Sequence, residues 1–332
     1  MRRRLLVGNQ CNIEFVDKID TIAGDICIVD NNNLEKYFIT SDSIECISAE
    51  DFTPIGVVVV PASHTDDGTA RIVSLAAMDY NNPDNGNTQG NIDISWGGYN
   101  SDVPNILFLT QAPYIATSPT ALTSSEQSIV GWQFLQNSQI CSDYYTNYQN
   151  PYDTNSYYQL TSNSCYPSPY LQDGSRNEIY HSTANTGNAL ADMNGKSNTA
   201  TILVVDNAVS TAWQTASTIT NNISAATNTQ PHTAAQCCWR YHTTGTTQGE
   251  WYLPAAGEMG YLASRWKAIK SSIGKVVGAG FAALELPVDY YGWSSSEYSS
   301  TYAVGLYFYS SYAGLGLNSK YGHYYVRAFC AV

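Results

Sequence analysis

One short stretch decides the fold of this chain: Gly249-Glu250-Trp251-Tyr252-Leu253-Pro254-Ala255-Ala256-Gly257-Glu258. A helix is predicted to begin after Pro254, with Glu258 in its first turn. Apolar residues then recur at intervals of three and four, which places them on one buried face: Met259, Leu262, Trp266 and Ile269. We expect this helix to continue to about Ile273 and to stop at Gly274.

Elements upstream of this stretch complete the expected core. A first helix is predicted over residues 208–225, whose apolar residues are spaced for one face: Val209, Ala212, Trp213 and Ala216. Two β-rich runs, at residues 55–60 and 70–75, predict a strand pair. The polar region at about residues 80–200 lies between this strand pair and the first helix. It predicts long ordered insertions on a scaffold.

The first 51 residues are predicted to form a small β unit. Residues 24–30 and 36–40 are β-rich, and the polar run Asn31-Asn32-Asn33 between them favours a turn. Two short strands bury little apolar surface alone, so the rest of the chain or a partner must cover them. We interpret residues 1–51 as an attachment and oligomerisation unit, with a trimer favoured, and residues 52–332 as the main domain.

The C-terminal segment is rich in tyrosine. Ten of the chain's 26 tyrosines fall between Tyr290 and Tyr325, mixed with Ser, Gly, Asn and His. This mixture is typical of antibody paratopes, in which rigid aromatic rings supply contact area and small polar residues supply adaptable contacts. Alternation places apolar residues on one anchoring face: Val304, Leu306, Phe308, Leu315 and Leu317.

The other face of this segment is expected to point outward. It carries Gly305, Gly314, Gly316 and Asn318, which in a core would leave voids and an unsatisfied amide. A closing strand is predicted at residues 326–329. The order of strand pair, two helices and late antiparallel sheets indicates an α+β fold.

Composition excludes several classes of function. The formal net charge of -13 disfavours nucleic acid and anionic membrane surfaces, which both require basic residues. The sequence shows no secretory signal and no apolar run long enough to span a bilayer, so we expect synthesis in the cytoplasm and no membrane insertion. The eight cysteines are then expected to be free and buried. They include no CxxC pair, and neither a metal nor a cofactor is expected.

Three segments occur in an order that is typical of one family. Residues 55–75 resemble its opening strand pair, and residues 249–258 resemble its turn into the second helix. The family's terminal signature has its likeness in two segments of this chain, Trp293-Ser294-Ser295-Ser296-Glu297 and, after it, Tyr325-Val326-Arg327-Ala328-Phe329. Together they resemble the C-type lectin fold of variable proteins of diversity-generating retroelements, and of related bacterial and phage surface proteins. The resemblance covers roughly residues 52–332 and is sharpest from about Thr201 onward.

This resemblance implies a variable, Tyr-rich face at about residues 289–325. In that family, error-prone copying at template adenines converts Asn codons into Tyr, Ser, Gly, His and other residues, within a constant frame that here includes Trp293. A rigid scaffold tolerates such changes when the side chains point outward. The predicted ligand-binding positions are Tyr290, Tyr291, Tyr298, Ser300, Tyr302, Gly305, Tyr307, Tyr309, Ser310, Ser311, Tyr312, Gly314, Gly316, Asn318, Ser319, Tyr321, Gly322, His323 and Tyr324.

Two relatives of this fold have chemistry that the sequence does not match. Calcium-dependent lectins use Glu-Pro-Asn or Gln-Pro-Asp with Trp-Asn-Asp, and the nearest tripeptide here is Asn82-Pro83-Asp84. Calcium-dependent sugar binding is therefore not expected. Formylglycine-generating enzymes use reactive cysteines. His232 and His242 lie near Cys237-Cys238 in the sequence, but packing is the favoured interpretation of these residues.

We therefore expect a non-enzymatic receptor-binding protein. Its partners would be a host cell-surface protein or glycan, and other virion proteins contacted through the N-terminal unit of a homo-oligomer. A phage or prophage virion, at the tip of a tail fibre, is the favoured location. The alternatives are a ligand-binding adhesin on the bacterial surface and, less favoured, an enzyme of the formylglycine-generating type.

Overall fold

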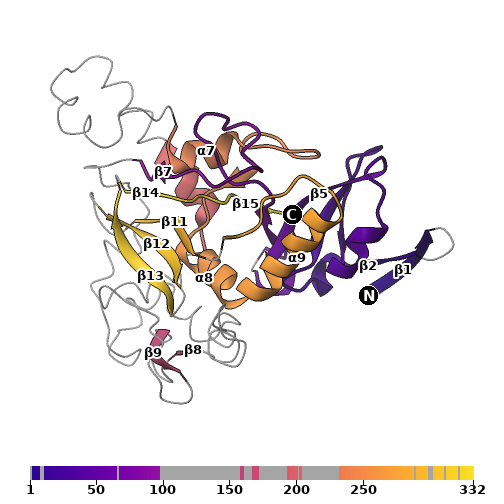
Figure 1. Ribbon diagram of the computed structural model, residues 1–332, viewed down its shortest axis with the longest axis horizontal. Coiled ribbons are helices and arrows are strands. Elements are labelled where there is room, and N and C mark those ends of the chain that lie inside the picture. The colour runs from indigo at the N-terminus through magenta and orange to yellow at the C-terminus, as the bar shows by residue number, and fades with distance from the viewer. Residues whose placement is uncertain are drawn as a thin grey trace.

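The computed structural model describes residues 2–7, 11–65, 67–97, 158–160, 167–171, 193–200, 202–203, 232–287, 289–297, 302–309, 312–320 and 322–332. Within these residues the protein consists of antiparallel sheets and a few helices, as Figure 1 shows. The predicted α+β class is therefore correct.

The largest sheet joins both ends of the chain. Its eight strands lie in the order β1-β2-β4-β3-β5-β6-β15-β10, and each neighbouring pair is antiparallel. The strands are β1 (Arg2–Val7), β2 (Cys11–Val16), β3 (Ile26–Asp30), β4 (Lys36–Ile39), β5 (Phe52–Val60), β6 (Arg71–Ser74), β10 (Trp251–Tyr252) and β15 (Phe329–Ala331). Since β3 pairs with β5, the boundary expected between residues 51 and 52 passes through a continuous sheet.

Strand β5 lies at the centre of the core because its β-branched side chains are buried on both faces. Val57 and Val59 pack with the helices that follow residue 255, whereas Ile55 and Val58 pack on the opposite face of the sheet. A strand covered on both sides needs a continuous apolar sequence, which is what this run provides.

The helix predicted after Pro254 is two helices. α8 (Ala256–Ser264) and α9 (Trp266–Gly278) are separated at Arg265, which has φ −118° and ψ 15°. Both pack against β5, and the predicted apolar face is buried. The predicted stop at Gly274 is wrong. The helix continues to Gly278, and the glycine in the left-handed conformation is Gly280, with φ +86°.

One buried carboxylate holds together the stretch of residues 249–258. Glu258, in the first turn of α8, accepts a hydrogen bond from the Ala255 backbone N–H at 2.8 Å and another from the Tyr252 hydroxyl at 2.7 Å. Strand β10, which precedes α8 in the chain, pairs with β15, so Tyr252 lies opposite Phe329. The stretch thus fixes where α8 begins relative to the sheet.

The terminal signature contains a buried cation. Arg327 donates hydrogen bonds to the carbonyls of Ser74, Leu75, Leu284 and Glu285, at 2.7–3.3 Å. Burial lowers the pKa of Arg327 to about 10. These bonds join the end of β6 to the segment that precedes the C-terminal sheet.

Smaller elements complete the described chain. The helix α7 (Ala234–Arg240) was not predicted, whereas the helix expected at residues 208–225 lies outside the described residues. Three short 3₁₀ helices, η1 (Lys18–Asp20), η2 (Ser41–Cys46) and η3 (Ala62–His64), follow β2, β4 and β5. Strands β8 (Tyr158–Leu160) and β9 (Pro167–Leu171) pair with each other. No helix in the described part of the chain is long and apolar enough to cross a membrane.

The C-terminal sheet lies at the opposite end of the molecule from the N-terminal strands (Figure 1). It contains β11 (Tyr290–Glu297), β12 (Tyr302–Tyr309) and β13 (Tyr312–Ser319), in that order. Beside it, β14 (His323–Tyr324) pairs with β7 (Ile94–Ser95). A parallel bridge from Gly292 to Tyr325 places β14 next to β11.

Candidate binding site

The Tyr-rich segment forms a sheet with two different faces. Tyr291 on β11 lies opposite Tyr307 on β12, which in turn lies opposite Gly314 on β13. On the other face, Val304 and Leu306 are buried in the core, as predicted. Phe308, Leu315 and Leu317 occupy the expected strands, although their side chains are not described.

Tyr290 belongs to the core face, which corrects its assignment as an outward residue. It is 1% exposed, and its ring centroid lies 5.2 Å from that of Trp266 and 6.1 Å from that of Tyr325. The reason is the alternation of side chains along a strand, because Tyr290 and its neighbour Tyr291 must point to opposite faces.

The second face of this sheet, which lies opposite the core face and was expected to point outward, is more buried than expected. Tyr307 and Asn318 are only 5% and 7% exposed, and Gly305 is also buried. Residues near β7 lie over this part of the sheet. The Trp293 indole N–H donates to the Ile94 carbonyl at 2.8 Å, and the Trp96 indole N–H donates to the Ser294 carbonyl at 2.7 Å.

A row of stacked tyrosine rings crosses the face where it approaches β14. Tyr291 stacks against Tyr307 at 5.4 Å between centroids and against Tyr324 at 4.2 Å. Tyr324 also meets Trp293 edge to face at 4.7 Å. The Tyr291 hydroxyl donates to Asn318 Oδ1 at 2.7 Å, which fixes the central ring of the row. Such an aromatic surface is rigid before any ligand arrives.

A hollow of about 410 Å³ opens at the β14 end of this row. It is lined by residues of β11 and β14, by the residues just before β7 and β11, and by the residue just after β14. These are Asp93, Asp289, Tyr290, Tyr291, His323, Tyr324 and Tyr325. Asp93, Asp289 and His323 are exposed, whereas Tyr291, Tyr324 and Tyr325 are half-buried. Although the Asp93 side chain as a whole is exposed, neighbouring protein atoms partly desolvate its carboxyl and raise its pKa, an effect that nearby His323 partly offsets.

Four of the predicted ligand-binding residues thus meet at this hollow: Tyr290, Tyr291, His323 and Tyr324. Elsewhere, Tyr302 is 44% exposed, and Ser319 and Gly322 are half-buried. Tyr309, Tyr312, Gly314 and Gly316 lie in strands, but their side chains are not described. Tyr298, Ser300, Ser310, Ser311 and Tyr321 lie outside the described residues.

Three residues of the hollow were not predicted: Asp93, Asp289 and Tyr325. Asp289 and Tyr325 directly flank predicted positions, so their place in the sequence was an available signal. Asp93 reaches the hollow from far along the chain, through the pairing of β7 with β14, and no local pattern announces that pairing.

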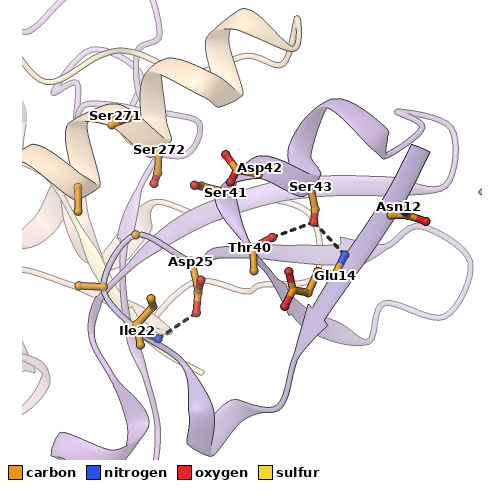
Figure 2. Close-up of a pocket in the computed structure, with 13 residues that line it drawn as sticks. Asn12, Glu14, Ile22, Asp25, Thr40, Ser41, Asp42, Ser43, Ser271 and Ser272 are labelled. Atoms are coloured by element: carbon orange, nitrogen blue, oxygen red, sulfur yellow. Dashed lines mark hydrogen bonds between the residues drawn. The ribbon is translucent and has the colours of Figure 1, made fainter. Parts of the chain in front are cut away.

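A second hollow, of about 510 Å³, lies between the N-terminal strands and α9 (Figure 2). Its polar groups serve the local fold. Asp25 accepts the Ile22 backbone N–H, the Ser43 hydroxyl accepts the Glu14 backbone N–H, and Asp42 binds Lys275. Among the described residues that line this hollow, none is aromatic. The hollow beside the tyrosine row therefore has the better composition for recognition.

The described cysteines are not arranged for thiol chemistry. Cys27, Cys237, Cys238 and Cys330 are free and buried, and burial raises the pKa of each thiol, that of Cys330 to about 12. His232 and His242 bind Arg240, at 3.0 and 3.1 Å.

Cys46 departs from the expectation that all eight cysteines are free, because it is disulfide-bonded. The expectation assumed that every thiol remains reduced.

Asp67 and Asp84 each have an arginine as partner. Asp67 binds Arg71 at 3.0 Å, and Asp84 binds Arg240 at 2.9 Å. No group of three or more His, Cys, Asp or Glu side chains in the described chain is placed to hold a metal ion.

Comparisons with known proteins give one distant structural likeness. No protein family matches the chain, and no curated protein sequence matches it. Among solved structures it is similar to a fimbrial protein from Bacteroides ovatus, with a TM-score of 0.39 and 15% identity. The match covers 94% of this chain and 49% of that protein, so this chain spans about half of that protein's length.

Proposed function

We propose that this chain is a non-enzymatic binding protein that recognises a macromolecule on a cell surface through the tyrosine row and the adjacent hollow. The observation that carries the proposal is the stack of Tyr307, Tyr291 and Tyr324, fixed by Asn318 and open at one end to a hollow with a charged rim. Rigid aromatic anchors beside polar groups are the usual centre of a recognition surface.

The framework around this surface supports the proposed kinship with C-type lectin-like variable proteins. The residues that resemble the family's constant positions are buried: Trp251, Tyr252, Glu258, Trp293, Arg327 and Phe329. The strands between them carry the mixed positions. Such a division would let side chains on β12 and β13 change while the buried frame holds the backbone.

Two locations follow from this proposal. The resemblance favours a virion, with the chain at a tail-fibre tip and its N-terminal strands directed to other virion proteins in a homo-oligomer. The disulfide at Cys46 favours the alternative, an adhesin displayed on a bacterial surface, because disulfides persist in oxidising surroundings. Either location requires the same binding face.

An enzymatic role of the formylglycine-generating type has less support. Such chemistry needs a thiolate with a lowered pKa near the surface. The four free cysteines of the described chain are buried, and each thiol pKa is raised.

The proposal is tested by binding of the purified full chain to intact bacterial cells and to a glycan array. Tyr291→Ala and Tyr324→Ala should each weaken binding about 30-fold, since both remove an anchor of the row. Tyr80→Ala removes a half-buried tyrosine that lines neither of the two hollows and serves as the matched control. If all three variants remain folded and bind like the wild type, the tyrosine row is not the binding site.

A further inference from the structure

The fixed charges that the structure describes around the hollow beside the tyrosine row have one sign. Asp93 and Asp289 both line it, and none of its described lining residues is Lys or Arg. The remaining titratable side chains are His323, whose imidazole is exposed, and the tyrosine phenols. An anionic ligand would meet two carboxylates in a protein that already carries a net charge of -13. The described charges of this hollow therefore favour a cationic ligand.

The two carboxylates reach the hollow from opposite sides of β14. Asp93 immediately precedes β7, which pairs with one side of β14, and Asp289 immediately precedes β11, which bridges to the other side. A ligand between them could bind both only if it had several donors pointing in different directions. A planar guanidinium has five N–H donors in a fixed arrangement and also packs well against aromatic rings, whereas an ammonium is a compact point charge.

The environment of Asp93 also favours an arriving cation. Partial burial raises the pKa of its carboxyl, which means that water solvates the carboxylate less well there than in solution. A cation in the hollow would replace part of that lost solvation by charge-assisted hydrogen bonds. The tyrosine rings are held by one another and by Asn318, so little ordering is needed when the ligand enters.

We propose that this hollow binds the side chain of an arginine presented by a protein partner. The inference rests on the proposed function and makes it more specific, because it selects a protein with an exposed arginine over a glycan. The arginine would enter between Asp93 and Asp289, with its aliphatic part against Tyr291 and Tyr324. It would be the central contact of an interface whose surroundings are set by the other positions of the C-terminal sheet.

The test uses a small probe and the full chain. N-acetyl-arginine methylamide carries one positive charge, and its citrulline counterpart has nearly the same shape without the charge. Their binding is measured by titration with ligand-detected NMR at low salt and at about 0.5 M salt. We expect the citrulline compound to bind about tenfold more weakly, and high salt to weaken only the arginine compound.

Variants assign the effect to the hollow. Asp93→Asn and Asp289→Asn change exposed side chains without changing their size, and each should weaken binding of the arginine compound about fivefold. Asp51→Asn, at an exposed aspartate just before β5, is the matched control and should bind like the wild type. Equal binding of the arginine and citrulline compounds, or equal loss in the Asp51→Asn control, would overturn the inference.

The same variants separate this inference from the proposed function. If Asp93→Asn and Asp289→Asn bind cells like the wild type while Tyr291→Ala does not, the tyrosine row is the binding site but its ligand is not an arginine. If methyl glycosides bind the wild type and both Asn variants equally well, the hollow is a neutral sugar site, and the inference is likewise wrong.

Discussion

Lys320 donates a hydrogen bond to Glu297 in the interior of the protein, and both side chains are sealed from solvent. Glu297 ends β11 and Lys320 follows β13, so this ion pair joins the two ends of the segment that carries β12 and β13. The Lys320 ammonium also lies 4.6 Å from the centre of the Trp96 ring. Lys320 stands between two predicted variable positions, Ser319 and Tyr321. Because its ammonium forms the buried ion pair with Glu297, we expect Lys320 itself to be constant.

Removal of one partner of this pair should strongly destabilise the protein. In Glu297→Gln or Lys320→Met, the remaining group is left in the interior without its counter-charge, at an expected cost of about 3–5 kcal/mol in the free energy of unfolding. The double variant Glu297→Leu with Lys320→Met removes both charges and should recover most of that loss. Urea unfolding of the four proteins measures these differences. A loss under about 1 kcal/mol in the single variants would show that the pair contributes little.

Substitutions of the adjacent Tyr290 and Tyr291 should separate effects on stability from effects on binding. Tyr290→Ala removes a ring that is packed against Trp266, so the free energy of unfolding should fall by about 3 kcal/mol. Tyr291→Ala removes a half-buried ring and the hydrogen bond to Asn318, for which we expect about 1 kcal/mol together with loss of target binding. Thermal unfolding and the cell-binding assay distinguish the two. The reverse order of stabilities would mean that the faces of β11 are wrongly assigned.

The sequence predicts those parts of the fold in which neighbouring residues carry the signal. The β-branched run that ends at Val60 and the alternation at Val304 and Leu306 both appear as expected. The helix α7 was missed, although Thr233 and Gln236 form a capping box that the sequence displays. Tyr290 was misassigned even though it stands beside Tyr291, and strict alternation excludes the same face for both.

The parts that could not be predicted depend on contacts between distant segments. β15 lies between β6 and β10, so the end of the chain completes a sheet begun at its start. Asp93 enters the hollow because β7 pairs with β14. The burial of Gly305 and Asn318 depends on how the second face is covered. None of these long-range contacts has a local sequence pattern, so the burial of Gly305 and Asn318 could not be predicted.

Gly305 and Asn318 should change together if they change at all. A Cβ atom at Gly305 would lie 2.5 Å from Asn318 Nδ2 and 3.1 Å from the Gly292 carbonyl oxygen. Asn318 cannot move without losing its bond to Tyr291. We expect Gly305→Ala to lower the free energy of unfolding by about 2 kcal/mol, and Asn318→Ala to remove part of that cost in the double variant. Additive losses in urea unfolding would show that the two positions vary independently.

Thiol reactivity should be low in the native protein. Cys27, Cys237, Cys238 and Cys330 are buried with raised thiol pKa values, so an alkylating reagent at neutral pH should leave them unmodified until the protein unfolds. Cys46 should become reactive only after reduction. Peptide mass spectrometry reads each site separately. Rapid alkylation of Cys237 or Cys238 in the native protein would instead support the thiol-dependent enzyme.

Stability should fall as the pH is lowered through the range in which His232 titrates. Burial, and then the neighbouring Arg240, lower the pKa of the His232 imidazole below its usual value of about 6.5. Its Nε2 lies 3.0 Å from Arg240 Nη1, a contact that requires the neutral ring as acceptor. The unfolded chain therefore takes up this proton at a higher pH than the folded chain does. Folding is therefore penalised as the pH falls below about 6.5.

His232→Gln removes this contribution, so the Tm of the variant should decline less steeply than that of the wild type over the same pH range. The nearby Asp84 has a pKa that its hydrogen bond from Arg240 lowers, so the stability it contributes is lost only at more acidic pH. The comparison therefore isolates the imidazole. Parallel curves of Tm against pH for the two proteins would mean that His232 titrates alike in the folded and unfolded chains.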